Sequence, residues 1–166
     1  MDFRNAEIKD LENILEIISH AKAYMKENGL TQWGGEYPNR EVISEDIEKG
    51  IGYVLTIDNL VKGYLVVDFV DDEIYRNIRG TWKTNCEYAS IHRCAMHKSI
   101  RGKGYGSELF KFAEELAKSK NISSVRVDTA PDNLTMKHLF EKNGYEYCGL
   151  VFIAGDKIAY EKVLDR

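Results

Sequence analysis

The chain has 166 residues and a formal net charge of −4, and 43% of its residues are hydrophobic. This length suits a single domain spanning residues 1–166, and the acidic balance argues against a general nucleic-acid-binding protein. No apolar run is long enough to cross a bilayer and no leader peptide is visible, so no membrane partner is expected. The three cysteines lack the spacing of a metal site or a disulfide framework, which predicts reduced thiols in a cytoplasmic protein.

The first part of the chain predicts one short strand and two helices. The strand is expected over residues 3–5, and a helix follows over 9–27, where apolar side chains recur every three or four residues. A second helix is expected over 41–49, with Asn39 as its N-cap. The face opposite its apolar residues is acidic, and we expect it to be solvated or, less often, to attract a basic molecule: Glu41, Glu45, Asp46 and Glu48.

The middle of the chain predicts a hairpin, a long excursion and a further strand. Segments 53–57 and 62–69 are rich in β-forming residues and flank Asp58-Asn59, a hairpin signal. The polar stretch 70–86 is expected to be a long loop with a short helical turn, and such loops are often functional. The next strand is expected over 87–96.

Residues 101–106, Arg-Gly-Lys-Gly-Tyr-Gly, separate that strand from an amphipathic helix expected over 107–120. The first amides of a helix have no intrahelical partners, and that end of the helix is partially positive. Glycines let an anion approach the backbone closely, and Arg101 and Lys103 add positive charge. The segment therefore predicts a phosphate or pyrophosphate site, although three alternate glycines alone also fit a flexible turn.

The C-terminal part predicts a strand over 125–129, a helix over 134–142 and a terminal hairpin formed by 145–153 and 157–164. Strands that alternate with helices in this way form a mixed sheet with helices on both faces, which is an α/β architecture.

Three segments give the chain a family resemblance. Residues 101–106 match R/Q-x-x-G-x-G/A, the acyl-CoA pyrophosphate signature of the GNAT superfamily of N-acetyltransferases. Residues 91–96 resemble that family's fourth strand, and residues 133–145 resemble its later motif, N-x-x-A-x-x-L-Y-E-K-x-G-F. The resemblance implies the GNAT fold, a mixed central sheet of about seven strands, flanked by about four helices and splayed between strands four and five.

The resemblance also implies acetyl-CoA as the acyl donor, with no metal. The backbone of the fourth strand would pair with the pantetheine arm, through Cys94, Ala95 and Met96. The pyrophosphate would be held by the glycine-rich segment and the residue after it: Arg101, Gly102, Lys103, Gly104, Tyr105, Gly106 and Ser107. Asn133 matches the family's asparagine near the pantetheine, and Phe140 stands where the family usually has a tyrosine that can protonate the leaving thiolate.

Acyl transfer to an amine needs a base, because an amine with a pKa near 10.4 is almost fully protonated at neutral pH. His92 is the first candidate, since strand alternation places it on one face with Ser90 and Cys94, where the family often has its base. A structural histidine is the alternative, and Glu87 is the second candidate base. The general acid is unassigned because a phenyl ring cannot donate a proton, and a nucleophilic Cys94 is disfavoured.

The resemblance implies a small-molecule or peptide amine as acceptor and direct transfer in a ternary complex. Trp33 and Tyr37 are candidate substrate residues in the loop between the first two helices, although burial of their rings to anchor the loop is an alternative. Two other functions stay open: an acyl-CoA-binding regulatory module with little turnover, and a nucleotide-phosphate binder of unrelated fold. A homodimer is compatible with the sequence.

Overall fold

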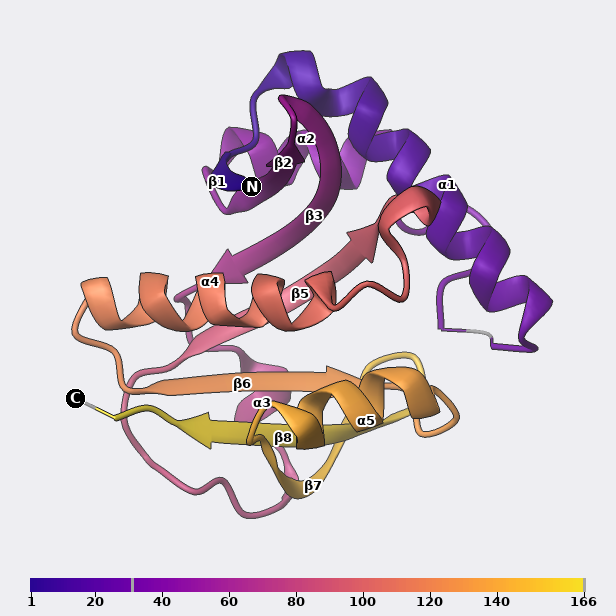
Figure 1. Ribbon diagram of the computed structural model, residues 1–166. Coiled ribbons are helices and arrows are strands. Elements are labelled where there is room, and N and C mark those ends of the chain that lie inside the picture. Colours follow the sequence, from indigo (N-terminus) through magenta and orange to yellow (C-terminus); the bar gives the residue numbers. More distant parts are fainter. Residues whose placement is uncertain (31, 166) are drawn as a thin grey trace. The chain divides into compact units, whose positions relative to one another are not determined.

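The computed structural model describes residues 1–30 and 32–165. Figure 1 shows their helices and strands and labels most of them. In chain order they are β1 (Asp2–Asn5), the 3-10 helix η1 (Ile8–Asp10), α1 (Leu11–Glu27), α2 (Arg40–Glu48), β2 (Gly52–Ile57), β3 (Leu60–Asp68), α3 (Glu73–Arg76), β4 (Arg79–Gly80), β5 (Ala89–Met96), the 3-10 helix η2 (Lys98–Ile100), α4 (Tyr105–Ser119), β6 (Ser124–Thr129), α5 (Leu134–Lys142), β7 (Glu146–Phe152) and β8 (Asp156–Val163).

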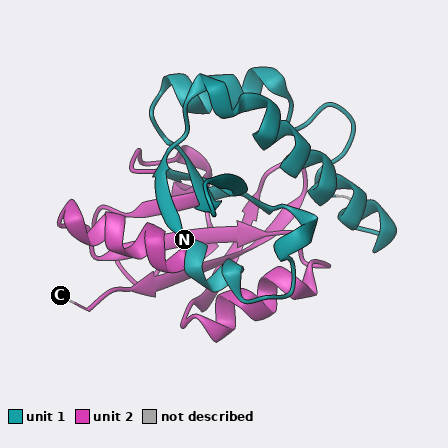
Figure 2. Ribbon diagram, turned by 45° about the horizontal axis from the view of Figure 1, so that its top comes forward, with its two compact units in different colours: residues 1–67, 92–109 teal, residues 68–91, 110–166 magenta. Residues whose placement is uncertain are grey.

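The chain forms two compact units, coloured separately in Figure 2. Unit 1 comprises residues 1–67 and 92–109, and unit 2 comprises residues 68–91 and the described residues from 110 onward. Strand β5 and helix α4 each contribute residues to both units. The single domain expected from the length stays a prediction.

Unit 1 contains an antiparallel β1-β2-β3 sheet, and β3 neighbours β5. Asp58 and Asn59 both have positive φ (53° and 65°), as a two-residue type I′ hairpin requires, so the predicted hairpin is confirmed. The apolar stripe of α1 forms the core of this unit together with Ile43 of α2 and inward side chains of β2 and β3.

Unit 2 contains the strand order β5-β6-β8-β7-β4, in which β6, β8 and β7 are antiparallel neighbours (Figure 1). Helix α5 inserts Phe140 into an aromatic cluster with Phe110, Tyr145 and Tyr160, at ring-centroid distances of 5.8, 6.2 and 5.2 Å respectively. Phe140 is 2% exposed, so this ring is part of the core.

The splay expected between the fourth and fifth strands stays a prediction, and the structure shows a short parallel ladder between β5 and β6. The pairs of their parallel ladder are Ala89↔Val125 and Ser90↔Arg126, and the rest of β5 lies outside that ladder. The backbone of β5 beyond Ser90 is therefore not part of this ladder with β6.

The predicted α/β class and GNAT fold are confirmed, with small differences in the elements. The described residues form eight strands, one more than expected, because the two-residue β4 was not predicted. The expected helical turn in the 70–86 excursion is α3, and the helix predicted over 134–142 is α5 with the same bounds. The described residues contain no helix that is both long and apolar enough to cross a membrane.

Candidate functional site

The glycine-rich segment turns into α4 through two left-handed glycines, Gly102 (φ 78°) and Gly104 (φ 87°). Ideal Cβ atoms built on either glycine meet no atom within 4 Å, so the loop faces open space where a side chain would point. Helix α4 is 15 residues long and begins at Tyr105, directly after the loop. The arrangement presents the positive end of a helix to an anion.

The side chain of Arg101 is held by α1. Its Nη2 donates to the carbonyl oxygen of His20 at 3.3 Å, and the guanidinium lies 4.6 Å from the ring centroid of Tyr24. Lys103, in contrast, is exposed. Arg101 thus supplies a fixed positive charge at the start of the loop, whereas Lys103 extends from it into solvent.

A left-handed residue interrupts β5. Arg93 has φ 50°, a conformation that non-glycine residues rarely adopt, and it separates His92 from Cys94. The expected common face of Ser90, His92 and Cys94 depends on regular alternation, which does not continue across this residue. The common face therefore loses its support from alternation, and His92, half-buried on β5, stays a predicted base.

Arg93 forms a buried ion pair with Asp46 of α2. The guanidinium reaches both carboxylate oxygens, Nε to Oδ2 at 2.9 Å and Nη2 to Oδ1 at 2.6 Å, and the Tyr64 hydroxyl donates to Oδ2 at 2.8 Å. Burial and the neighbouring carboxylate raise the pKa of Tyr64 well above its usual value. Asp46 is 3% exposed, so the expectation that it belongs to a solvated acidic face was wrong.

The candidate substrate residues of the 30–40 loop have different environments. Trp33 packs against the core of unit 1, which supports loop anchoring. Tyr37 is 45% exposed, and its hydroxyl accepts a hydrogen bond of 3.1 Å from Nη1 of Arg93. Arg93 thus connects β5, α2 and this loop within unit 1.

Cys94 has the properties of a structural thiol. Burial raises its pKa to about 12, so the thiol stays protonated near neutral pH. A protonated thiol is a poor nucleophile, which agrees with the expectation that Cys94 does not attack the substrate.

Asn133, predicted near the pantetheine, has a structural partner in unit 2, and two tyrosines of this unit are buried. Oδ1 of Asn133 accepts from the Met136 amide at 3.1 Å, which makes Asn133 the N-cap of α5. The Tyr145 hydroxyl donates to Glu114 at 3.0 Å, and burial raises the pKa of Tyr160. No proton donor for the leaving thiolate is identified by these contacts.

Unit 2 also contains a cavity of about 440 Å³, lined mainly by residues of the 70–88 excursion: Phe69, Asp71, Arg76, Trp82, Asn85, Cys86, Glu87, Tyr88 and Arg126. Its volume is within the range of small-molecule sites.

Most charges in the cavity wall are paired. Asp71 pairs with Arg76 at 3.1 Å, and Arg126 pairs with Glu161 at 3.3 Å while its guanidinium lies near the rings of Trp82 and Tyr88. Glu87 is exposed, lies before the start of β5 rather than on the strand, and has no ion-pair partner within the described part of the chain. The wall therefore carries one uncompensated negative charge, on the second candidate base.

Sequence reasoning missed the side-chain contacts that hold β5 and the glycine loop of unit 1 in place. Nothing in the sequence linked Asp46 to Arg93, which are 47 positions apart. Glu16 and His20 of α1, which contact the turn before the glycine loop, carried only the weak signal of i,i+4 spacing on a helix.

Comparisons with known proteins agree with this geometry. The Acetyltransferase (GNAT) family matches residues 22–145. The uncharacterized N-acetyltransferase YesJ of Bacillus subtilis is 23% identical over 143 residues, which are 85% of this chain and 79% of YesJ. A GNAT-family acetyltransferase from Streptococcus agalactiae is 32% identical, with a TM-score of 0.91 over 99% of this chain and 96% of that chain.

A third protein, yncA of Salmonella typhimurium, was solved with its cofactor acetyl-CoA. It shares the fold at 17% identity, with a TM-score of 0.71 over 100% of this chain and 95% of that chain. Because the family match covers more than half of the chain and strand β5, the glycine loop and helix α4 occur in the expected order, the chain belongs to the GNAT family of acetyltransferases and is an acyltransferase.

Proposed function

We propose that the chain transfers the acetyl group of acetyl-CoA directly to a primary amine, with both substrates bound at once. The observation that carries this proposal is the loop before α4, where Gly102 and Gly104 are left-handed and face open space. A pyrophosphate would meet the backbone of the loop and the positive end of α4 there. The backbone of β5 beyond Ser90, which is outside the ladder with β6, is the proposed partner of the pantetheine arm.

The reaction needs no covalent enzyme intermediate. The amine nitrogen bonds to the thioester carbonyl carbon, the C–S bond breaks, and CoA leaves as a thiolate while a base takes the amine proton. His92 is the first candidate base and Glu87 the second. The chain supplies no assigned acid, so in this proposal the thiolate leaves unprotonated or takes a proton from water.

The cavity of unit 2 is the proposed acceptor site. Its uncompensated carboxylate, on Glu87, would attract the protonated form in which an amine arrives. The proposed acceptor is therefore a small molecule or peptide terminus with a positively charged primary amine.

An acyl-CoA-binding module with little turnover is the second candidate function. It is favoured by Phe140, a buried ring without a hydroxyl where the family usually has a tyrosine. Calorimetry with acetyl-CoA and thiol release against a panel of primary amines separates the two functions. Binding with amine-dependent release supports the transferase, binding without release supports the module, and no binding contradicts both.

Replacing Gly104 by Val should weaken acetyl-CoA binding about tenfold or more, because the left-handed conformation costs a side chain about 1–2 kcal/mol and the new side chain fills the anion site. Gly50 offers a matched control, since it also has positive φ (71°) and open space around its Cβ position but follows α2. Gly50→Val should strain the backbone similarly and leave the affinity unchanged. Equal affinities for Gly104→Val and the unmodified chain would remove the loop as the pyrophosphate site.

Replacing His92 by Ala tests the base. A general base acts deprotonated, so activity should rise with pH through its pKa, and the variant should lose this rise together with about 10²-fold or more of kcat/KM. The exposed His138 on α5 provides the control substitution. If the pH–rate profile of His92→Ala matches that of His138→Ala, Glu87 becomes the first candidate.

A further inference from the structure

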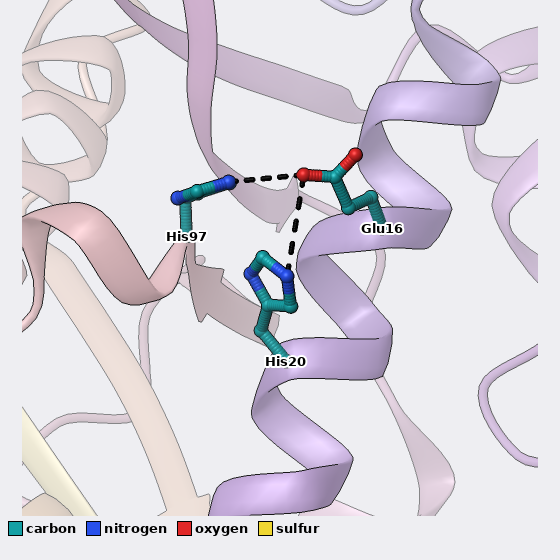
Figure 3. A group of neighbouring side chains, drawn as sticks. All are labelled: Glu16, His20 and His97. Carbon is teal, nitrogen blue, oxygen red and sulfur yellow. Dashed lines mark hydrogen bonds and ion pairs between the residues drawn. The ribbon is translucent and has the colours of Figure 1, made fainter.

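A cluster of two histidines and a glutamate lies beside the glycine loop in unit 1 (Figure 3). Oε1 of Glu16 is 3.0 Å from Nε2 of His97 and 4.0 Å from Nε2 of His20. The two imidazole rings meet edge to face at 4.5 Å. Glu16 and His20 are one turn apart on α1, whereas His97 directly precedes η2.

The hydrogen bonds of the rings determine where their protons lie. Nδ1 of His97 accepts from the Ser99 amide at 3.1 Å, and Nδ1 of His20 accepts from the Lys98 amide at 3.3 Å. A neutral imidazole that accepts at Nδ1 carries its proton on Nε2. The Nε2 proton of His97 therefore points to Glu16, an arrangement that favours a hydrogen bond over a metal ion, which would need the protons on Nδ1.

His97 fixes the turn that leads into the loop. Its imidazole caps η2 through the Ser99 amide, and its own amide donates to the Lys62 carbonyl of β3 at 2.8 Å. Arg101, at the end of the same turn, is held by the His20 carbonyl and the Tyr24 ring. Helix α1 thus contacts both ends of the turn that precedes Gly102, at His97 and at Arg101.

We infer that His97 and Glu16 are a positioning pair for the glycine loop, in which the carboxylate orients the imidazole and the imidazole caps the turn. The inference rests on the proposed function, because the loop that the pair positions is the proposed acetyl-CoA site. Loss of the pair should raise the Kd and KM for acetyl-CoA and leave kcat at saturating donor within about twofold, since the pair touches no reacting atom.

The variants differ in what they retain. His97→Ala loses both the cap and the contact to Glu16, and should raise the Kd about tenfold. His97→Asn keeps a side-chain cap acceptor but does not reach Glu16, and Glu16→Ala removes the same contact from the other side. Because Glu16 is more than half exposed, each of these two should raise the Kd only about threefold.

A double variant tests whether Glu16 acts through His97. If it does, Glu16→Ala combined with His97→Asn should weaken binding no more than either change alone. The control is Glu12→Ala, which removes an exposed ion pair of the same helix, to Arg40 at 2.6 Å. Additive losses, or an equal loss in Glu12→Ala, would overturn the inference.

Hydrogen exchange makes the test independent of acetyl-CoA. The amides of residues 98–104 should exchange faster in His97→Ala than in the unmodified chain or in Glu12→Ala. If the unmodified chain binds no acetyl-CoA, the proposed function fails, while unchanged exchange would overturn the positioning role by itself. The last measurement is the Tm with and without zinc chloride. If zinc raises the Tm of the unmodified chain but not of His97→Ala, the cluster is a metal site and not a hydrogen-bonded pair.

Discussion

Asp10 illustrates how one side chain can fix the start of a helix. Arg4 donates to both of its carboxylate oxygens, at 2.8 and 3.0 Å, and the Glu7 amide donates to Oδ2 at 2.8 Å. The Arg4 hydrogen bonds are the largest cause of a lowered Asp10 pKa. A carboxylate with a lowered pKa stabilises the folded state above its unfolded pKa of about 4, and this contribution is lost as the pH falls through the folded pKa.

Asp10→Asn should therefore lower the free energy of unfolding by about 1–3 kcal/mol at pH 7. The difference from the unmodified chain should persist at pH 6 and shrink progressively below about pH 4. Urea unfolding at several pH values measures it, with the exposed Asp2→Asn as control for the change in net charge. A difference that is as large at pH 2.5 as at pH 7 would contradict the assigned role of the ionised carboxylate.

Asp46 shows that the ion-pair partner of a single residue could not be predicted from the sequence. The sequence grouped it by charge with Glu45 and Glu48, yet on a helical wheel it follows Val42 and Ile43 by four and three positions, and it is buried and paired with Arg93. Helical periodicity reports which face a residue is on, but not that a distant arginine in a left-handed conformation reaches that face. The residues contacted by Glu16 and His20 were unpredictable for the same reason, whereas the glycines of the loop could be predicted because their conformational role is local.

Asn133 is both a predicted ligand-binding residue and the N-cap of helix α5. By family resemblance it lies near the pantetheine, and in the structure its side chain caps α5 through the Met136 amide. The two roles separate on substitution, because Asp also caps helices well while its charge would disfavour an anionic ligand nearby. Asn133→Asp should leave the free energy of unfolding within about 0.5 kcal/mol and weaken acetyl-CoA binding, whereas Asn133→Ala should cost about 1 kcal/mol.

Chemical denaturation and calorimetry with acetyl-CoA measure the two effects separately. The N-cap Asn39 of α2 provides the control, since its side chain accepts from the Val42 amide at 3.0 Å in the same way. Asn39→Asp should change neither quantity. If Asn133→Asp binds acetyl-CoA as tightly as the unmodified chain, Asn133 is a helix cap without a role at the donor.

The long elements could be predicted from the sequence, whereas the shortest ones could not. Helix α5 has the predicted bounds, and α1 and the β2–β3 hairpin lie where apolar periodicity and turn residues placed them. Elements of two or three residues, such as β4 and η2, have too few positions for a periodic signal, and they form because of neighbours far away in sequence. Glu87 lies outside β5 because strand ends are set by pairing partners rather than by propensity.

At the scale of the whole molecule, β5, like α4, contributes residues to both compact units. Ala89 pairs with Val125 of β6 in unit 2, whereas Ala95 belongs to the core of unit 1. Unfolding of either unit would remove the packing partners of half of this strand. A strand shared in this way favours cooperative unfolding, which is what the predicted single domain requires.

The two tryptophans provide a direct test, because the chain has only Trp33 in unit 1 and Trp82 in unit 2. Trp33 packs against the core of the first unit, and Trp82 packs beside Tyr75 and Tyr88 in the second. In Trp82→Phe the fluorescence reports on unit 1, and in Trp33→Phe it reports on unit 2. Within each variant, the urea midpoint from fluorescence should coincide with the midpoint from far-UV circular dichroism, which averages over the whole chain. If the fluorescence midpoint falls below the dichroism midpoint in one variant and above it in the other, the units unfold separately, and the chain behaves as two domains that share a strand.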